Sequence, residues 1–209
     1  MTLRADHRDP DLYLASRSPR RAELLRTLGV QFALLDIEID ETVRPGEPPK
    51  DYVLRLAREK AAAGRMLSAG RAPVLGADTS VVVDGEILGK PEDEQHLQRM
   101  LSRLSGRWHE VYTGVALAAA VPGAVCVCPR VRMRTLAARE IACYWASGEP
   151  ADKAGGYAVQ GLGGALVERL EGSYSNVVGL PLVETLALLS AARVPHALAP
   201  RASGSMASR

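Results

Sequence analysis

The sequence predicts an α/β protein with a mixed β-sheet, in which one chain forms two lobes. Short apolar segments alternate with amphipathic ones along the chain, which is typical of strands that alternate with helices. With 209 residues, of which 47% are hydrophobic and 24% charged, the chain can build one sizeable core or two lobes around a cleft. No internal repeat and no clear linker divides the sequence, so two sequential domains are disfavoured.

The expected elements begin with a strand and a helix. Leu12–Ala15 is a short apolar run, typical of a buried strand. The helix that follows has Ser18 as its N-cap and Pro19 at its first position, and it ends at Gly29. These residues make the start and the end of the first helix well defined.

Further elements follow in the order in which their patterns occur. The apolar run 73–83 contains Asp78-Thr79-Ser80 near its middle, and Asp84-Gly85 is a hairpin turn signal before a strand over 86–88. The remaining expectations are β structure over 30–40, a Pro-rich loop over 44–50, helices over 51–69, 92–104, 137–147 and 181–192, and strands over 111–120, 125–133 and 166–170.

Composition disfavours two classes of protein. A net charge of +2 and 4% aromatic residues argue against nucleic-acid binding, which normally needs a basic surplus or aromatic platforms. No apolar run approaches the roughly 18 residues of a membrane span, and residues 1–11 lack the apolar core of a secretion signal. Neither a zinc site nor a disulfide framework is indicated by Cys126, Cys128 and Cys143. We expect a cytoplasmic protein with no nucleic-acid or membrane partner.

The first helix begins with cations, although its dipole favours anions there. Arg20 and Arg21 lie in the first turn, beside free amide groups and the hydroxyls of Ser16 and Ser18. Such a group suits a phosphate, which would neutralise the guanidiniums and accept hydrogen bonds from the amides. The alternative is that both arginines point into water, and the pattern alone does not choose between the two.

Lys60 and Asp78 both lie where an apolar residue is expected. The spacing of Lys60 from Leu56 and Ala57 places it inside the apolar stripe of its helix, so it either reaches a cleft or snorkels from the stripe's edge. Asp78 interrupts an apolar strand pattern, and a buried carboxylate needs a cation, a metal or several hydrogen bonds. We favour a metal ligand or general base at a strand end over an aspartate that caps a β-bulge or turn.

Other patterns are less specific. Glu38, Asp40 and Glu41 form a carboxylate cluster. Such a cluster is more often a solvated face than a metal site. Several glycines lie around Gln160: Gly155, Gly156, Gly161, Gly163 and Gly164. They indicate either a backbone that passes close to a ligand or ordinary turns. No GxxxxGK[ST] motif is present, so a P-loop is excluded.

Eight short, distinctive stretches occur along the chain: 16–21 (SRSPRR), 56–61 (LAREKA), 76–79 (GADT), 88–91 (LGKP), 104–107 (LSGR), 152–161 (DKAGGYAVQG), 172–174 (GSY) and 178–181 (VGLP). In this order they resemble the Maf family of nucleoside triphosphate pyrophosphatases. The resemblance extends from about residue 12 to residue 192, and this many stretches in register are highly specific. Residues 119–139 do not align well and are candidates for dimer contacts.

The resemblance implies an elongated, Maf/Ham1-like fold with a central cleft. It also implies hydrolysis of a nucleoside triphosphate to its monophosphate and pyrophosphate, aided by a divalent cation, Mg²⁺ or Mn²⁺. Asp78 matches the family's proposed proton acceptor. Arg20, Thr79 and Gln160 match the positions that are linked to substrate choice in the subgroup that prefers dTTP and UTP. CTP and modified pyrimidine nucleotides are further candidate substrates.

We assign roles to ten residues. The catalytic residues are Asp78, Lys60 and Lys90; the substrate-binding residues are Ser16, Ser18, Arg20, Arg21, Thr79 and Gln160; and the metal ligands are Asp78 and Glu41. Whether Asp78 deprotonates water directly or orients it on the metal stays open. Two alternatives remain, a pyrophosphatase for a purine or 7-methyl-GTP substrate and a non-enzymatic nucleotide-binding regulator of cell division.

The expected domain organisation is simple. An N-terminal extension covers residues 1–11, a single catalytic domain covers 12–195, and a disordered C-terminal tail covers 196–209. A homodimer is the candidate assembly.

Overall fold

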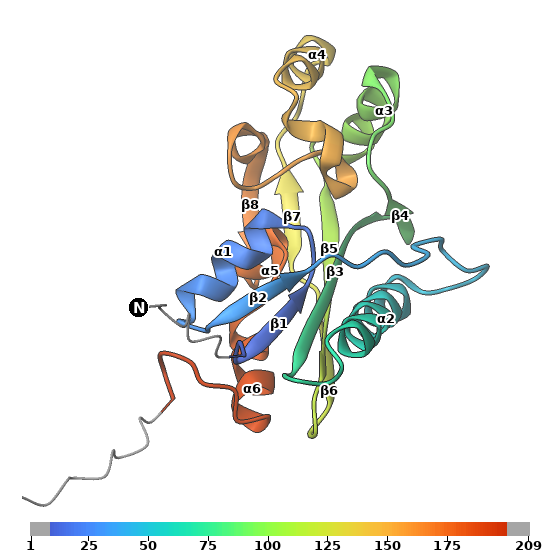
Figure 1. Ribbon diagram of the computed structural model, residues 1–209. Helices are drawn as coiled ribbons and strands as arrows, with labels where there is room; N and C mark the ends of the chain where they lie inside the picture. The colour runs from blue at the N-terminus through green and yellow to red at the C-terminus, as the bar shows by residue number, and fades with distance from the viewer. Residues whose placement is uncertain (1–8, 200–209) are drawn as a thin grey trace, which may run out of the picture.

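The computed structural model describes residues 9–199 and contains a mixed eight-stranded sheet with helices on both faces (Figure 1). The strands are β1 Leu12–Ala15, β2 Phe32–Leu35, β3 Val74–Val83, β4 Glu86–Leu88, β5 Trp108–Ala118, β6 Gly123–Val127, β7 Arg130–Met133 and β8 Val167–Glu171. The α-helices are α1 Pro19–Thr27, α2 Pro49–Leu67, α3 Glu94–Leu104, α4 Ala138–Ala146, α5 Tyr174–Val178 and α6 Leu182–Ala191, and the 3₁₀ helices are η1 Glu149–Asp152, η2 Ala154–Gly156 and η3 Leu162–Leu166. The predicted α/β class with a mixed sheet is confirmed.

Three details differ from the sequence expectation. The apolar run 73–83 forms one unbroken strand, β3, because Asp78 pairs in register with Gly114. The strand expected over 125–133 is two strands, β6 and β7, and Pro129, which has no amide proton to donate, lies between them. The short helix α5 lies in a region where glycines and a weak apolar pattern gave no helix signal.

The chain ends lie partly outside the described residues. Residues 1–8 of the expected extension and residues 200–209 of the expected tail are not described. At the start of that tail, the amide of Ala197 donates to the carbonyl of Leu28 at 2.8 Å. Within residues 9–199, no helix combines the length and the apolar character needed to cross a membrane.

Two long strands form the spine of the molecule. β3 and β5 are antiparallel and pair from Val74 opposite Ala118 to Val82 opposite Glu110. At one end of this spine β1 and β2 pair in parallel and β6 adds to β5, while at the other end β4 pairs with β3 and β7 links β5 to β8. The spine gives the molecule its elongated shape (Figure 1).

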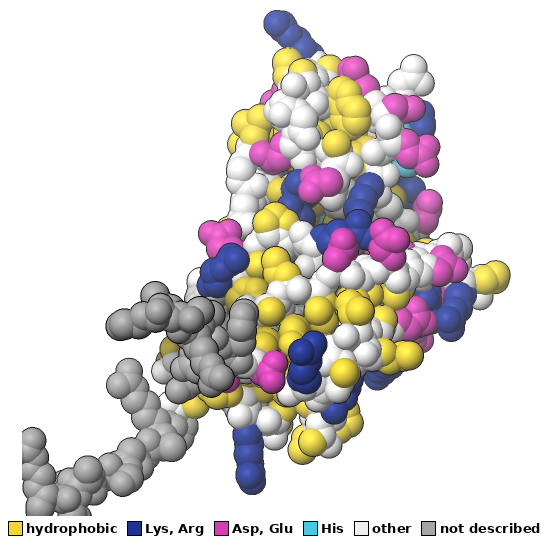
Figure 2. Space-filling model, in the orientation of Figure 1, with side chains coloured by type: hydrophobic (Ala, Val, Ile, Leu, Met, Phe, Trp, Pro, Cys, Tyr) yellow, Lys and Arg dark blue, Asp and Glu magenta, His cyan; other side chains and the backbone are white. Residues whose placement is uncertain are grey.

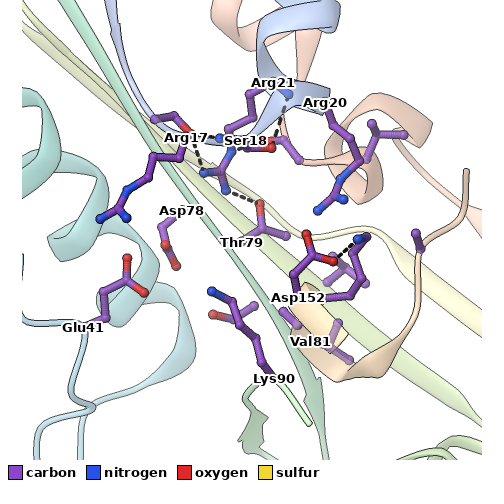
Figure 3. Close-up of a pocket in the computed structure, with 18 of the residues that line it drawn as sticks. Arg17, Ser18, Arg20, Arg21, Glu41, Asp78, Thr79, Val81, Lys90 and Asp152 are labelled. Atoms are coloured by element: carbon purple, nitrogen blue, oxygen red, sulfur yellow. Dashed lines mark hydrogen bonds and ion pairs between the residues drawn. The ribbon is translucent and has the colours of Figure 1, made fainter. Parts of the chain in front are cut away.

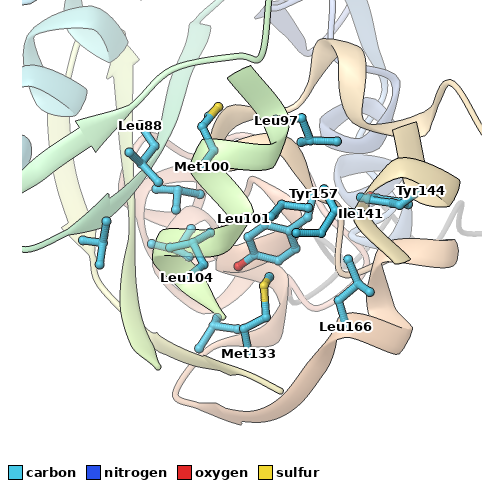
Figure 4. Close-up of a cluster of buried hydrophobic side chains, with 14 residues drawn as sticks. Leu88, Leu97, Met100, Leu101, Leu104, Met133, Ile141, Tyr144, Tyr157 and Leu166 are labelled. Carbon is cyan, nitrogen blue, oxygen red and sulfur yellow. The ribbon is translucent and has the colours of Figure 1, made fainter. Parts of the chain in front are cut away.

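Each end of the spine has its own hydrophobic core, which confirms two lobes. In the first lobe, α1 and α6 cover the sheet, and the core includes Leu14, Leu25, Leu75 and Leu189. In the second lobe, α3 contributes Leu97 and Leu101 and α4 contributes Ile141 to a core that also includes Met133 and Tyr157 (Figure 4). The two clusters share no residue, so the spine crosses from one core to the other.

Two glycines bring α2 down onto the spine. A Cβ atom at Gly76 would lie 2.3 Å from the carbonyl oxygen of Ala57, and one at Gly114 would lie 2.4 Å from that of Val53. Only glycine allows such an approach of helix backbone to strand backbone. The next residue on the face of Gly76 is Asp78, because strand side chains alternate. The packing of α2 therefore places Lys60, one turn beyond Leu56, above Asp78.

Candidate active site

The cleft opens where β3 lacks a neighbour on one edge. β1 pairs with β3 as far as Gly76, and β4 begins to pair with it at Val81. No described strand pairs with that edge between these two residues. The interval holds Asp78 and Thr79, whose side chains point to opposite faces of the sheet. A ligand in the gap can therefore contact groups from both faces.

A cleft of about 820 Å³ occupies this gap, a volume within the usual range for small-molecule sites. Six basic and four acidic side chains line it, so cations are in excess. Figure 2 shows basic and acidic side chains gathered across the waist of the molecule. The structure brings together all ten residues assigned from the sequence: Ser16, Ser18, Arg20, Arg21, Glu41, Lys60, Asp78, Thr79, Lys90 and Gln160.

Lys60 reaches the cleft from α2 and binds two carboxylates. Its Nζ atom lies 2.8 Å from Asp78 Oδ1 and 2.6 Å from Glu41 Oε1. The side chains of Lys60 and Asp78 are only 10% and 11% exposed, whereas that of Glu41 is 49% exposed. Of the two interpretations of Lys60, the geometry supports the one in which the side chain enters a cleft.

Asp78 lies in the middle of β3, which corrects the expectation of a strand end. The alternative, an aspartate that caps a bulge or turn, is also wrong, because the register with β5 is regular on both sides of Asp78. Its carboxylate is buried beside Gly114, which has no side chain to cover it. Pairing with Lys60 makes this burial tolerable.

Burial and charge act in opposite directions on the two carboxylates. Burial raises the pKa of Asp78, and the charges of Lys60 and Arg21 only partly oppose this. Burial also raises the pKa of Glu41, but the hydrogen bond and charge of Lys60, with smaller effects from Lys90 and Arg21, lower it overall. Asp78 is therefore a stronger base than a solvated aspartate, and it lies within reach of a cation.

Arg21 enters the cleft from α1, on the other face of the sheet. Its Nε donates to the carbonyl of Gly179 at 2.9 Å, Nη1 to Ser16 Oγ at 3.3 Å and Nη2 to Thr79 Oγ1 at 3.0 Å (Figure 3). Burial lowers the pKa of Arg21, and Asp78 opposes that shift. A guanidinium still keeps its charge. For Arg21, the alternative of a side chain that points into water is wrong.

The hydroxyl of Thr79 is engaged on two sides. Thr113 Oγ1 donates to the carbonyl of Asn176 at 3.0 Å, so it accepts the proton of Thr79 Oγ1, which lies 2.9 Å away. Thr79 Oγ1 in turn accepts the hydrogen bond from Arg21. The single hydroxyl proton of Thr79 thus points to Thr113, and one lone pair remains for a ligand.

The start of α1 has the features that the sequence indicates. Ser18 is the N-cap, and its Oγ accepts from the amide of Arg21 at 3.4 Å, while Ser16 Oγ accepts from the amide of Ser18 at 3.2 Å. No acidic residue lies in the first turn. Arg20 extends toward Asp152 across the cleft (Figure 3). The terminus therefore presents cations and hydroxyls to the cleft.

The opposite wall belongs to the second lobe and the segment that follows β4. Lys90 is exposed and points its ammonium toward Asp78 and Glu41 (Figure 3). Gln160 lines the cleft together with Ala158 and Val159. Cations from three different segments thus surround one carboxylate pair.

Sequence reasoning missed several residues of the cleft and its support. Arg17 lines the cleft and pairs with Asp36 and Glu38 at 2.7 and 2.8 Å. The hydroxyl of Tyr52 donates to the carbonyl of Glu41 at 2.8 Å and so fixes the backbone of the carboxylate segment. Thr113 and Asn176, which support Thr79, were also missed. Thr113 could have been found as a polar residue within the apolar run 111–120, whereas no sequence pattern marks Asn176.

The carboxylate pair is compatible with a divalent cation. Oxygens of Asp78 and Glu41 both lie within hydrogen-bond distance of the same Nζ atom, so they can face one ion. No group of three or more His, Cys, Asp or Glu side chains suited to a metal occurs within residues 9–199. Mg²⁺ commonly takes one or two carboxylates and completes its shell with water and substrate phosphates. The residues therefore fit a metal shared with substrate.

Comparison with known proteins matches this chain to a family. The family model Maf, described as "Maf-like protein", matches residues 11–192. Proteins named "dTTP/UTP pyrophosphatase" from Methylobacillus flagellatus and Hahella chejuensis are 55% and 56% identical to the chain, over 85% of its length and 90% of theirs. The protein of that name from Escherichia coli O157:H7 is 55% identical over 86% of this chain and 91% of its own.

Solved structures show weaker similarity. A dITP/XTP pyrophosphatase from Mycobacterium abscessus has a TM-score of 0.38 and 21% identity, over 58% of this chain and 73% of its own. The Ham1 protein of Staphylococcus aureus has a TM-score of 0.40 and 12% identity, over 58% of this chain and 71% of its own.

Proposed function

The chain belongs to the Maf family, and from this premise we propose that it hydrolyses dTTP and UTP to the nucleoside monophosphate and pyrophosphate. One observation carries the proposal: a buried carboxylate, Asp78, is held by Lys60 in the gap of β3, next to a fixed Arg21. This arrangement places a base and two cations around a space large enough for a nucleotide.

The cationic end of the cleft binds the triphosphate. Arg21 is held by three hydrogen bonds, Arg20 lies beside it at the start of α1, and Lys90 brings further positive charge from the opposite wall. The hydroxyls of Ser16 and Ser18 lie at the N-terminus of α1, which favours phosphate oxygens. Because Arg21 is fixed before substrate binds, this guanidinium needs little reorganisation as charge develops on the phosphates.

Asp78 accepts a proton from the attacking water. One oxygen, Oδ1, is bound by Lys60, and no group in residues 9–199 donates to Oδ2, which is free to take the proton. The water oxygen forms a bond to the α-phosphorus, and the bond from that phosphorus to the bridging oxygen breaks. The electron pair leaves with pyrophosphate, whose charge Arg21 and Lys90 stabilise.

The second lobe selects the base. Gln160 presents an amide, which can donate to a pyrimidine carbonyl and accept from its ring NH. The proton of Thr79 is engaged with Thr113 and its oxygen accepts from Arg21, so this hydroxyl can offer the base only an acceptor lone pair. The nucleotide thus lies with its phosphates in the gap of β3 and its base against the second lobe.

We propose that catalysis depends on Mg²⁺ or Mn²⁺, which Asp78, Glu41 and the substrate's phosphate oxygens would hold. When bound, such a cation would neutralise phosphate charge and polarise the α-phosphoryl group. Lys60 binds both carboxylates, partly opposes the rise in the pKa of Asp78 and orients the two groups toward the same point. We also propose that the protein acts in the cytoplasm and that it forms a homodimer, for which residues 119–139 are the candidate contacts.

A substrate panel tests the proposed function. Pyrophosphate release is measured with dTTP, UTP, CTP, dATP, dGTP, ITP and 7-methyl-GTP, each with Mg²⁺, with Mn²⁺ and with EDTA. The proposal predicts the highest kcat/KM for dTTP and UTP and no turnover with EDTA. Preference for ITP or 7-methyl-GTP would contradict the substrate assignment, and tight nucleotide binding without any release would favour the non-enzymatic regulator.

A further inference from the structure

Behind the wall that carries Gln160, one carboxylate holds the backbone of a loop. Glu149 Oε2 accepts from the amide of Leu162 at 2.8 Å, and Oε1 accepts from the amide of Gly163 at 2.8 Å. The hydroxyl of Tyr144 also donates to Oε1, at 2.8 Å. Hydrogen bonds to a charged acceptor are stronger than neutral ones, so this carboxylate is a firm anchor.

The same network reaches the chain on the other side of Gln160. Tyr144 Oη accepts from the amide of Ala158 at 3.4 Å while its proton is donated to Glu149. Ala158 lies two residues before Gln160, and Leu162 lies two residues after it. Glu149 and Tyr144 therefore fix the backbone on both sides of Gln160.

Two glycines make room for this network. Gly161 has φ +86°, and a Cβ atom there would lie 2.5 Å from Glu149 Oε2. A Cβ atom at Gly163 would lie 2.5 Å from Tyr144 Oη. Two of the five glycines noted in the sequence are thus explained here by close approach of the protein's own groups, the carboxylate at Gly161 and, at Gly163, the hydroxyl together with the carbonyl of Ala158.

Neither anchor residue can touch a substrate in the cleft. Tyr144 is 2% exposed, and Glu149 is not among the residues that line the cleft. Burial raises the pKa of Glu149, but the amides of Gly163 and Leu162 and the hydroxyl of Tyr144 lower it overall, so the carboxylate is ionised at neutral pH. Any effect of these two residues on substrate choice must pass through the loop that they hold.

We propose that Glu149 and Tyr144 are positioning residues that set base selection by fixing the loop around Gln160. The inference rests on the proposed function, because it concerns the base of the nucleotide. The phosphate end of the cleft is built from α1, α2 and β3 together with Glu41 and Lys90, and none of these contacts Glu149 or Tyr144 through a hydrogen bond of this network. The two ends can therefore be separated by experiment.

The test compares Glu149→Gln and Tyr144→Phe with the wild-type chain. A glutamine side chain has only one acceptor oxygen, so in Glu149→Gln it cannot satisfy all three donors, and the loop loosens at Leu162. We expect KM for dTTP to rise about tenfold and the preference for dTTP over dGTP to fall by a similar factor. Inhibition by pyrophosphate, which has no base, should not change. Tyr144→Phe should act in the same direction with a smaller effect.

Glu140→Gln is the matched control. Glu140 also accepts a backbone hydrogen bond, from Ala137 at 2.9 Å, but it lies on α4 away from the cleft. The inference is overturned if KM and selectivity are unchanged in Glu149→Gln, or if pyrophosphate inhibition weakens in parallel, as a general structural role would require. If Glu149→Gln does not fold, Tyr144→Phe decides by the same measurements. A wild-type chain without dTTP hydrolysis would instead refute the proposed function itself.

Discussion

Lys60 and Asp78 are 18 residues apart in the sequence, yet Lys60 Nζ lies 2.8 Å from Asp78 Oδ1. The contact depends on Gly76, which lets α2 lie directly on β3. Because α2 and β3 are fixed by the core, the base and its cation are in place before substrate arrives. This preorganisation is the physical basis of the proposed catalysis.

The first prediction concerns the shape of the cation at position 60. In Lys60→Arg the charge is kept, but a planar guanidinium cannot place one nitrogen between Asp78 and Glu41 as an ammonium does. We expect kcat for dTTP to fall by at least about tenfold, measured by pyrophosphate release. Lys50→Arg, in the exposed first turn of α2, is the control and should retain full activity. Equal turnover of the two variants would show that the geometry at Lys60 is unimportant.

The second prediction concerns pH. Asp78 must be ionised to accept a proton, and burial raises its pKa above the ordinary value of 3.8, so kcat/KM should begin to fall at a higher pH than for a solvated aspartate. Lys60→Met removes a charge that opposes this shift, and the acid limb should move to still higher pH. The measurement is kcat/KM for dTTP against pH in both proteins. A limb that moves to lower pH in the variant would contradict the pairing.

The third prediction concerns the hydrogen-bonded chain behind Arg21. Thr113 is fully buried, so Thr113→Val cannot alter a direct substrate contact, but it removes the acceptor for Thr79. We expect kcat/KM to fall about five- to tenfold, the effect of one hydrogen bond, because Arg21 is then held less firmly. Thr185→Val, at a buried threonine of α6 whose hydroxyl has no partner in residues 9–199, is the control. Equal kinetics for both variants would show that Thr113 does not help to hold Arg21.

The fourth prediction concerns stability at low pH. His109 is buried, its Nε2 lies 2.7 Å from Tyr157 Oη, and burial lowers its pKa from 6.5 to about 4. Between these values the unfolded chain binds a proton that the folded chain does not, so the free energy of unfolding should fall by about 3 kcal/mol from pH 7 to pH 4. Urea unfolding at several pH values should show that His109→Gln loses this component, whereas His96→Gln in α3 keeps it.

Much of the site could be predicted from residues that break a local pattern. Lys60 on an apolar helical stripe and Asp78 in an apolar strand were visible because each conflicts with burial, and the cations at the start of α1 conflict with its dipole. The resemblance to a family then placed Thr79 and Gln160. All of these line the cleft in the structure.

The supporting contacts could not be predicted in this way. Glu149 and Tyr144 bind backbone amides of a segment more than ten residues away. Because every residue except proline has such an amide, a backbone donor cannot be recognised from the sequence. The place of Asp78 in mid-strand depends on register with β5, since a gap on one edge of β3 arises only when the sheet is assembled. Contacts that depend on strand register and sheet topology can therefore be identified only once the fold is known.

The proton-accepting role of Asp78 is tested most directly by pyrophosphate release from dTTP in Asp78→Asn, with circular dichroism as a check of folding. Asparagine keeps the shape of the side chain and can still accept a hydrogen bond from Lys60, but it cannot take a proton from water. We expect a loss of about 10²–10⁴-fold in kcat with the fold retained, while Asp84→Asn, at the exposed turn after β3, stays active. A folded Asp78→Asn variant with wild-type turnover would contradict the account.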